Sequence, residues 1–65
     1  MLDEWLDIIE RNVRETAILV KLRILRDTRN PIHLYELLKE LSVRSYNHLI
    51  PPEKEIERWF KEELR

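Results

Sequence analysis

This 65-residue chain lacks both glycine and cysteine, and its 12 lysines and arginines nearly balance its 13 aspartates and glutamates. Without glycine, the positive φ angles of tight hairpins and phosphate-binding loops are costly, and without cysteine there is neither a disulfide nor a thiolate metal site. We therefore expect one small helical domain over residues 1–65 and no enzyme, because so short a helical chain rarely encloses a pocket that perturbs pKa values.

Two further features of the composition bear on location and origin. The longest apolar run, Ala17 to Val20, is far shorter than the ~20 residues of a membrane span. Asp3, Glu4 and Asp7 stand where a secretory signal would carry basic residues, so we expect a cytoplasmic protein that does not enter a membrane. The wealth of charged and aliphatic residues, with no glutamine, resembles thermostable proteins or de novo designed sequences.

The first predicted element is a long helix over about residues 3–28, because no helix-breaking residue interrupts this stretch. Acidic residues in its first turn, and Arg26 and Arg29 near its end, suit the helix dipole. Apolar residues spaced by three or four positions define one face of this helix: Leu2, Leu6, Ile9, Val13, Ala17, Val20 and Ile24.

A second apolar stripe follows the opposite face of the same predicted helix and consists of Ile18, Leu22 and Leu25. A helix that is apolar on two sides must be covered on two sides, so this stripe is either a further core surface or a contact surface for a partner or a second copy. We take it as the candidate protein interface. An alternative is a strand, since Ile18 to Ile24 also alternates apolar and basic residues.

The second half of the chain predicts two more helices and a short turn. Asn30 is a suitable N-cap and Pro31 a suitable first residue for a helix over about residues 31–43. A short turn of helix is predicted at 45–50, and a last helix at about 52–64. The fold class is thus an all-α bundle of three to four helices. The expected core residues of the later helices are Leu34, Leu37, Leu38, Leu41, Ile56, Trp59, Phe60 and Leu64, and Trp5 should join them.

The stretch from Tyr35 to Ile50 places a leucine-rich helix before a polar segment, Arg44-Ser45-Tyr46-Asn47-His48. Over about residues 17–50 the chain resembles helix-turn-helix, or tri-helical, DNA-binding domains. The resemblance implies that one polar segment reads bases while the basic stretch 11–29 contacts phosphates. The residues it assigns to a nucleic acid are Arg44, Ser45, Asn47, His48, Lys21, Arg23 and Arg26. In an alternative register the last helix, with its five glutamates, would face the DNA.

Metal and catalytic chemistry find little support in the sequence. His33 and Glu36 are spaced as two ligands one helical turn apart, and His48 is the only other histidine. We expect no metal, no cofactor, no catalytic residue and no small-molecule substrate. Two functional hypotheses remain: a non-enzymatic helical module that binds a protein partner or forms a homo-oligomer, and, as the alternative, a small DNA-binding regulator.

Overall fold

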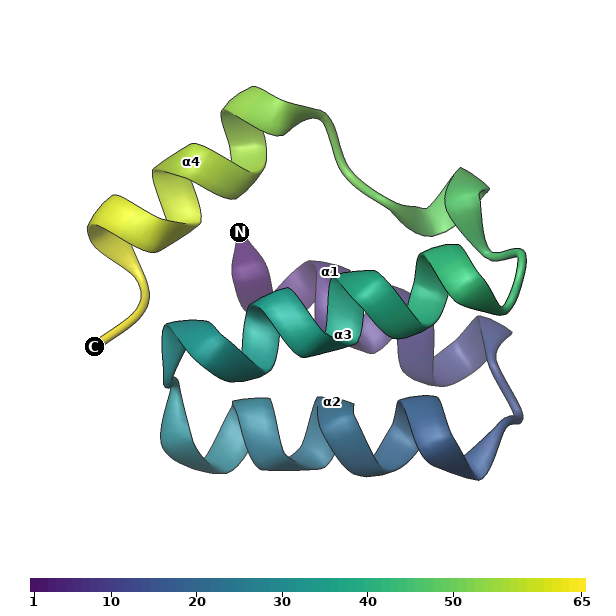
Figure 1. Ribbon diagram of the computed structural model, residues 1–65. Helices are drawn as coiled ribbons and strands as arrows, with labels where there is room; N and C mark the ends of the chain where they lie inside the picture. Colours follow the sequence, from purple (N-terminus) through teal and green to yellow (C-terminus); the bar gives the residue numbers. More distant parts are fainter.

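A computed structural model describes the whole chain, residues 1–65, and confirms the all-α fold class (Figure 1). It contains four α-helices and one short 3-10 helix, and no strand, so the strand alternative for Ile18 to Ile24 is wrong. In chain order the elements are α1 (Leu2–Asn12), α2 (Thr16–Thr28), α3 (Pro31–Val43), η1 (Asn47–Leu49) and α4 (Glu53–Glu62).

The prediction of one long helix over residues 3–28 is wrong, because the chain breaks between α1 and α2. Val13 (φ −121°, ψ 136°) and Glu15 (φ −75°, ψ 125°) are extended, and the chain reverses direction there. A straight helix over residues 3–28 would be about 39 Å long at 1.5 Å per residue, whereas the longest dimension of the molecule is 28 Å. Because the chain reverses at residues 13–15, apolar residues of both α1 and α2 can pack into one core.

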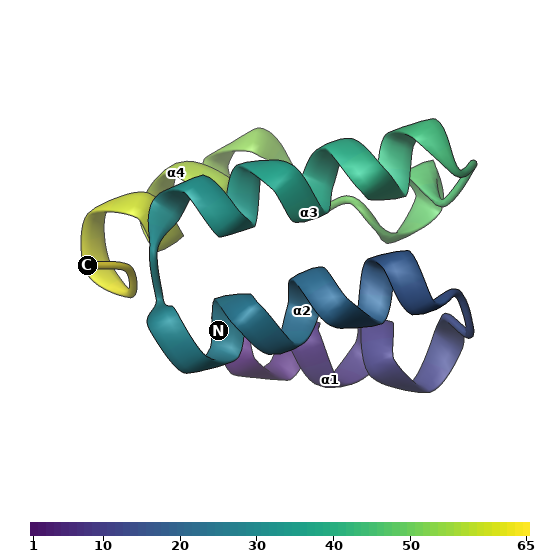
Figure 2. The same ribbon diagram turned by 60° about the horizontal axis from the view of Figure 1, so that its bottom comes forward.

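The helices form a small bundle: in Figure 1, α4 lies at the top, α1 and α3 in the middle and α2 at the bottom, and the turned view of Figure 2 shows α2 between α1 and α3. The closest packing joins α2 to α3, which run antiparallel. Twelve apolar residues are buried in one core, and no polar or charged residue is buried with them: Leu2, Trp5, Leu6, Ile9, Val13, Ile18, Leu22, Leu25, Leu34, Leu37, Leu41 and Trp59.

The start of α3 follows the prediction from Asn30 and Pro31. The Asn30 side chain accepts a hydrogen bond from the Ile32 backbone N–H (3.0 Å), and Pro31 occupies the first turn. The reversals on either side of α3 use left-handed backbone at residues other than glycine, Arg29 (φ 56°) and Ser45 (φ 69°). Two helices of this chain therefore end in a left-handed residue, the position that glycine usually occupies.

The predicted turn at 45–50 is confirmed as η1, and the predicted last helix forms as α4. Three hydrogen bonds connect this part to the rest of the bundle: the Trp5 indole donates to the Leu49 carbonyl (2.8 Å), the Leu2 N–H donates to Glu63 (3.2 Å), and the Arg65 N–H donates to the Arg29 carbonyl (2.9 Å).

Trp59 is the one residue of α4 in the buried core, and its ring centroid lies 5.1 Å from that of Trp5. Phe60, expected in the core, is instead 41% exposed, because Trp59 and the partly buried Ile56 already fill the side of α4 that faces the bundle. No helix of the structure is both long enough and apolar enough to cross a bilayer.

Candidate functional site: a groove between α1 and α2

The stripe predicted as a protein interface is part of the core. Ile18 and Leu25 are fully buried and Leu22 is 3% exposed in the single chain. The break between α1 and α2 is the reason, since it brings α1 and α3 onto α2 and buries this stripe, while Val20 on the other apolar face stays 49% exposed. The assignment of Ile18, Leu22 and Leu25 to an interface is therefore wrong for Ile18 and Leu25, and Leu22 contributes only a nearly buried side chain to the groove described next.

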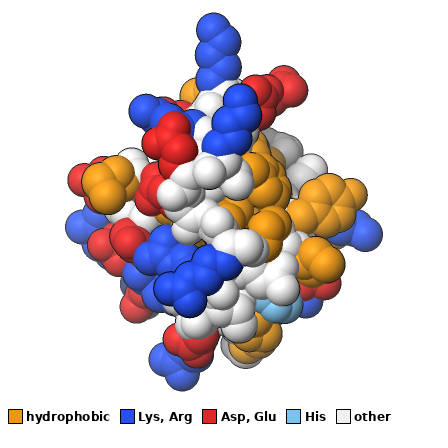
Figure 3. Space-filling view, turned by 90° about the vertical axis from the view of Figure 1, so that its left-hand side faces the viewer, with side chains coloured by type: hydrophobic (Ala, Val, Ile, Leu, Met, Phe, Trp, Pro, Cys, Tyr) orange, Lys and Arg blue, Asp and Glu red, His pale blue; other side chains and the backbone are white.

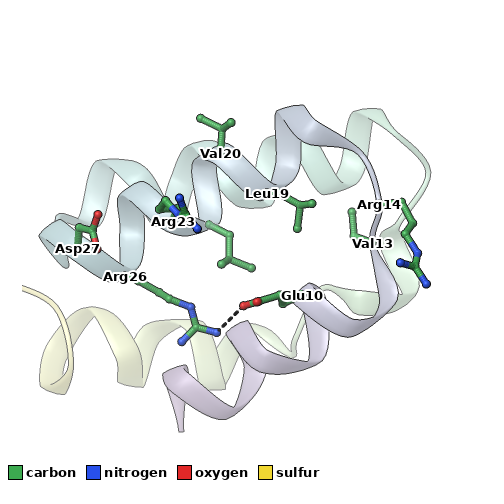
Figure 4. Close-up of a pocket in the computed structure, with 9 residues that line it drawn as sticks. Glu10, Val13, Arg14, Leu19, Val20, Arg23, Arg26 and Asp27 are labelled. Atoms are coloured by element: carbon green, nitrogen blue, oxygen red, sulfur yellow. Dashed lines mark hydrogen bonds and ion pairs between the residues drawn. The ribbon is translucent and has the colours of Figure 1, made fainter.

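The structure places an open groove elsewhere on α2, along its boundary with α1 (Figure 4). We call it the α1–α2 groove; its volume is about 630 Å³. Four apolar and five charged residues line it: Val13, Leu19, Val20, Leu22, Glu10, Arg14, Arg23, Arg26 and Asp27. The volume falls within the range of about 300–1,000 Å³ that is typical of ligand sites, but the groove is open along one side.

Ion pairs between the two helices lie toward one end of this boundary. Arg29 of the α2–α3 turn contacts Asp3 (2.6 Å), and Arg26 contacts Asp7 (2.6 Å) and Glu10 (3.3 Å). Toward the connector at residues 13–15, apolar side chains line the boundary instead. Leu19 extends from α2 toward α1 there and is half-buried, while Val20 beside it is 49% exposed.

The three arginines of the groove differ in their electrostatic state. Arg26 is neutralised by two carboxylates, and its hydrogen bond to Asp7 raises the pKa of the guanidinium further above its ordinary value. Arg14 and Arg23 are exposed, and neither forms an ion pair within the chain. The groove thus offers apolar surface beside two arginines that form no ion pair, with the equally unpaired Asp27 at its far end.

The basic residues assigned to a nucleic acid are brought together only in part. Arg23 and Arg26 share the α1–α2 groove, but Lys21 lies on the other side of α2, where it contacts Glu36 of α3 (3.5 Å). Arg44 is held by Glu40 (3.2 Å) and by Glu15 (3.1 Å). Three of these four bases are therefore paired with acidic residues of the same chain.

The polar segment after α3 forms no long helix. Ser45 adopts left-handed backbone, and Asn47 and His48 lie in η1, a single turn of three residues. The neighbouring Tyr46 is half-buried and donates a hydrogen bond to Glu15 (3.3 Å); burial, together with this carboxylate, raises the pKa of the phenol. Asn47 and His48 are exposed, but they sit on a tight turn rather than along a helix.

The histidines do not share a site. His33 lies in the first turn of α3 with its Nδ1 atom 3.2 Å from Glu36, whereas His48 lies beyond the other end of that helix. No three histidine, aspartate or glutamate side chains converge as metal ligands do.

Other exposed apolar residues lie outside the groove. Ile32, Tyr35 and Val43 stand on α3 and are 62%, 67% and 72% exposed, but none of them lines the groove. On the face drawn in Figure 3, acidic and basic side chains lie next to each other on the left, and several apolar side chains gather on the right. None of these α3 residues lines the hollow between α1 and α2, which has the volume of a ligand site, so the groove is the stronger candidate site.

Sequence reasoning missed the roles of Arg14, Leu19 and Val20. Leu19 belongs to neither predicted stripe. Its position was the one signal in the sequence that α2 has apolar surface on a third side. The site also depends on the chain reversal, which no residue type announces. No protein-family model, curated protein or solved structure matches this chain, so the proposals that follow rest on its own geometry.

Proposed function

We propose that this protein is a non-enzymatic helical module that acts by binding another protein chain, and that the α1–α2 groove is its contact surface. The observation that carries the proposal is the combination of exposed Val20, half-buried Leu19 and two unpaired arginines along one open groove. Apolar surface beside arginine is typical of protein interfaces, where arginine is enriched and lysine and glutamate are depleted.

The charge distribution favours a protein partner over DNA. A DNA-binding surface gains most of its affinity from basic side chains that neutralise phosphates. Here Lys21, Arg26 and Arg44 already contact carboxylates, and those carboxylates would also lie near the phosphates. Of the four lysine and arginine residues that the sequence assigned to a nucleic acid, only Arg23 forms no ion pair with an acidic residue of the chain.

A nuclear magnetic resonance titration of ¹⁵N-labelled protein tests the proposal. Three amphipathic helical peptides, with acidic, neutral and basic flanks, and a duplex DNA of random sequence are added separately at low salt. We expect saturable shifts of the Val13, Leu19 and Val20 amides with at least one peptide. No effect of any peptide, or shifts at Arg44 to His48 with the DNA, would contradict the proposal.

A matched pair of variants locates the contact surface. Val20→Glu places a charge in the groove, whereas Ile32→Glu places the same charge on an exposed site of α3. Val20→Glu should abolish the peptide-induced shifts, and Ile32→Glu should retain them. Equal effects of the two substitutions would mean that the groove is not the contact surface.

A further inference from the structure

The geometry points to a specific occupant for the α1–α2 groove: an amphipathic helix of a partner protein whose apolar face is flanked by carboxylates. This inference rests on the proposed function and adds the chemistry of the partner. It follows from the length and openness of the groove and from the charges that line it.

The shape of the groove suits a helix. Both of its walls are helix surfaces, and a third helix packs into such a surface by interlocking rows of side chains. The chain has no strand, so it offers no sheet edge to which an extended peptide would pair. A groove open along one side also leaves much of a small ligand in solvent, whereas small-molecule sites usually bury most of their ligand.

The length of the groove sets the length of the contact. Its lining runs along α2 from Leu19 to Asp27, which is about 12 Å at 1.5 Å per residue. Anchor residues at positions i, i+3 or i+4, and i+7 of a docked helix span about 10.5 Å. Two to three turns of the partner therefore match the length of the groove, and its apolar anchors gather at the connector end, against Val13, Leu19 and Val20.

The charge of the groove selects carboxylates. Arg26 is satisfied by Asp7 and Glu10, and because one guanidinium faces two carboxylates there, this cluster adds no positive charge to the groove. Arg14 and Arg23 remain without acidic partners, so a helix that covers Leu19 would bring its flanking residues close to them. Carboxylates at those flanks would form complementary pairs, whereas lysines would meet like charge.

The two ends of the groove differ in charge, and this difference determines which way a charged partner helix would lie. Arg14 lies at the connector end of the groove, and Asp27 lies at the far end, one turn beyond Arg23 (Figure 4). Carboxylates of the partner should accordingly gather over the stretch from Arg14 to Arg23. A neutral or basic residue of the partner suits the end at Asp27.

A charge-exchange experiment tests this inference. Two fluorescein-labelled peptides of about 15 residues carry the same leucine face and differ only in their flanks, glutamate in one and lysine in the other. Binding is followed by fluorescence anisotropy with the full chain, and circular dichroism verifies that each variant remains helical. The protein variants are Arg14→Glu/Arg23→Glu and, as a control with the same change in net charge, Lys54→Glu/Lys61→Glu on α4.

The acidic peptide should bind the wild-type chain at least about tenfold more tightly than the basic peptide, the sum expected from two exposed charge pairs. Arg14→Glu/Arg23→Glu should reverse this preference, and Lys54→Glu/Lys61→Glu should keep it. Equal binding of both peptides, or a preference that survives Arg14→Glu/Arg23→Glu, would overturn the inference and leave the proposed function standing.

The same samples also test for two other outcomes, a complete absence of peptide binding and self-association of the chain. Failure of every peptide to bind, a neutral one included, would overturn both the inference and the proposed function. Sedimentation of the unlabelled chain detects self-association, and a dimer that Val20→Glu dissociates would assign the groove to a second copy and overturn the inference.

Discussion

Ser45 shows how this chain ends a helix without glycine. Its φ of 69° is left-handed, and the hydrogen bonds from the N–H groups of Ser45 to Ser42 (3.3 Å) and of Tyr46 to Leu41 (2.8 Å) form the ending that glycine usually provides. A residue with a side chain is destabilised by about 1–2 kcal/mol in this conformation. Glycine would remove that strain, but it would also make the unfolded chain more flexible, which offsets part of the gain.

We therefore predict that Ser45→Gly stabilises the protein by about 0.5–1 kcal/mol. Ser42→Gly is the control, because Ser42 lies within α3 and is also exposed. That substitution should lower the free energy of unfolding by a similar amount, since glycine weakens a helix interior. Urea denaturation of the two variants measures both effects, and a loss of stability in Ser45→Gly would contradict the account of its backbone.

The two tryptophans of the core differ in the state of their indole N–H groups. The Trp5 indole donates to the Leu49 carbonyl, whereas the indole nitrogen of Trp59 is buried without a hydrogen-bond partner. Trp5→Phe should therefore reduce stability by about 1–3 kcal/mol more than Trp59→Phe, because only the first removes a bond and the second removes an unsatisfied donor. Chemical denaturation compares the two, and the reverse order would refute the assignment.

At the scale of elements, local signals determined what the sequence could predict. The start of α3 was predictable because Asn30 and Pro31 act within their own turn, and η1 because the prolines that follow stop a helix. The break at Val13 to Glu15 contains neither glycine nor proline, and Glu15 begins α2 without a capping hydrogen bond from its side chain. It is stabilised by tertiary contacts, among them those of Glu15 with Arg44 and Tyr46.

The candidate site was less predictable than the helices because it depends on that break. A helix continuous from 3 to 28 points Ile18 and Leu22 outward, and this is why they were assigned to an interface. Once α1 folds back, these residues enter the core and the boundary with α1 exposes Leu19 and Val20 instead. Residues 1–28 could be recognised as helical from periodicity, but their surface could not be assigned without the tertiary fold.

The contact between α2 and α3 should make stability depend on acidity. Glu36 of α3 accepts a hydrogen bond from His33 and faces Lys21 of α2, and these contacts lower the pKa of its carboxyl below the ordinary value of 4.5. The stabilisation is present in full above that ordinary value and is lost as the pH falls through the lowered pKa.

We predict that the free energy of unfolding decreases between pH 6 and pH 3, and that Glu36→Gln shows a smaller decrease than the wild type. Glu57→Gln is the control, because Glu57 is exposed and forms no ion pair. Urea denaturation at the two pH values provides the measurement. An identical pH dependence in Glu36→Gln and the wild type would show that the contact with His33 and Lys21 does not act as described.

For the molecule as a whole, the distribution of the core predicts unequal local stability. The helices α2 and α3 each bury three residues and pack closely on each other, whereas α4 buries only Trp59. A helix held by one buried side chain and a few hydrogen bonds should open without unfolding the rest, since regions with little buried apolar surface open at the lowest free energy.

Native-state hydrogen exchange should therefore show α4 amides opening at a free energy at least about 1.4 kcal/mol below that of Leu22 and Leu37, a tenfold difference in protection. Leu25→Ala, which truncates a fully buried core side chain of α2, should bring the two sets of amides closer together, because global unfolding then becomes nearly as easy as the opening of α4. Equal protection of α4 and α3 in the wild type would instead mean that the Trp5–Trp59 pair makes the bundle one cooperative unit.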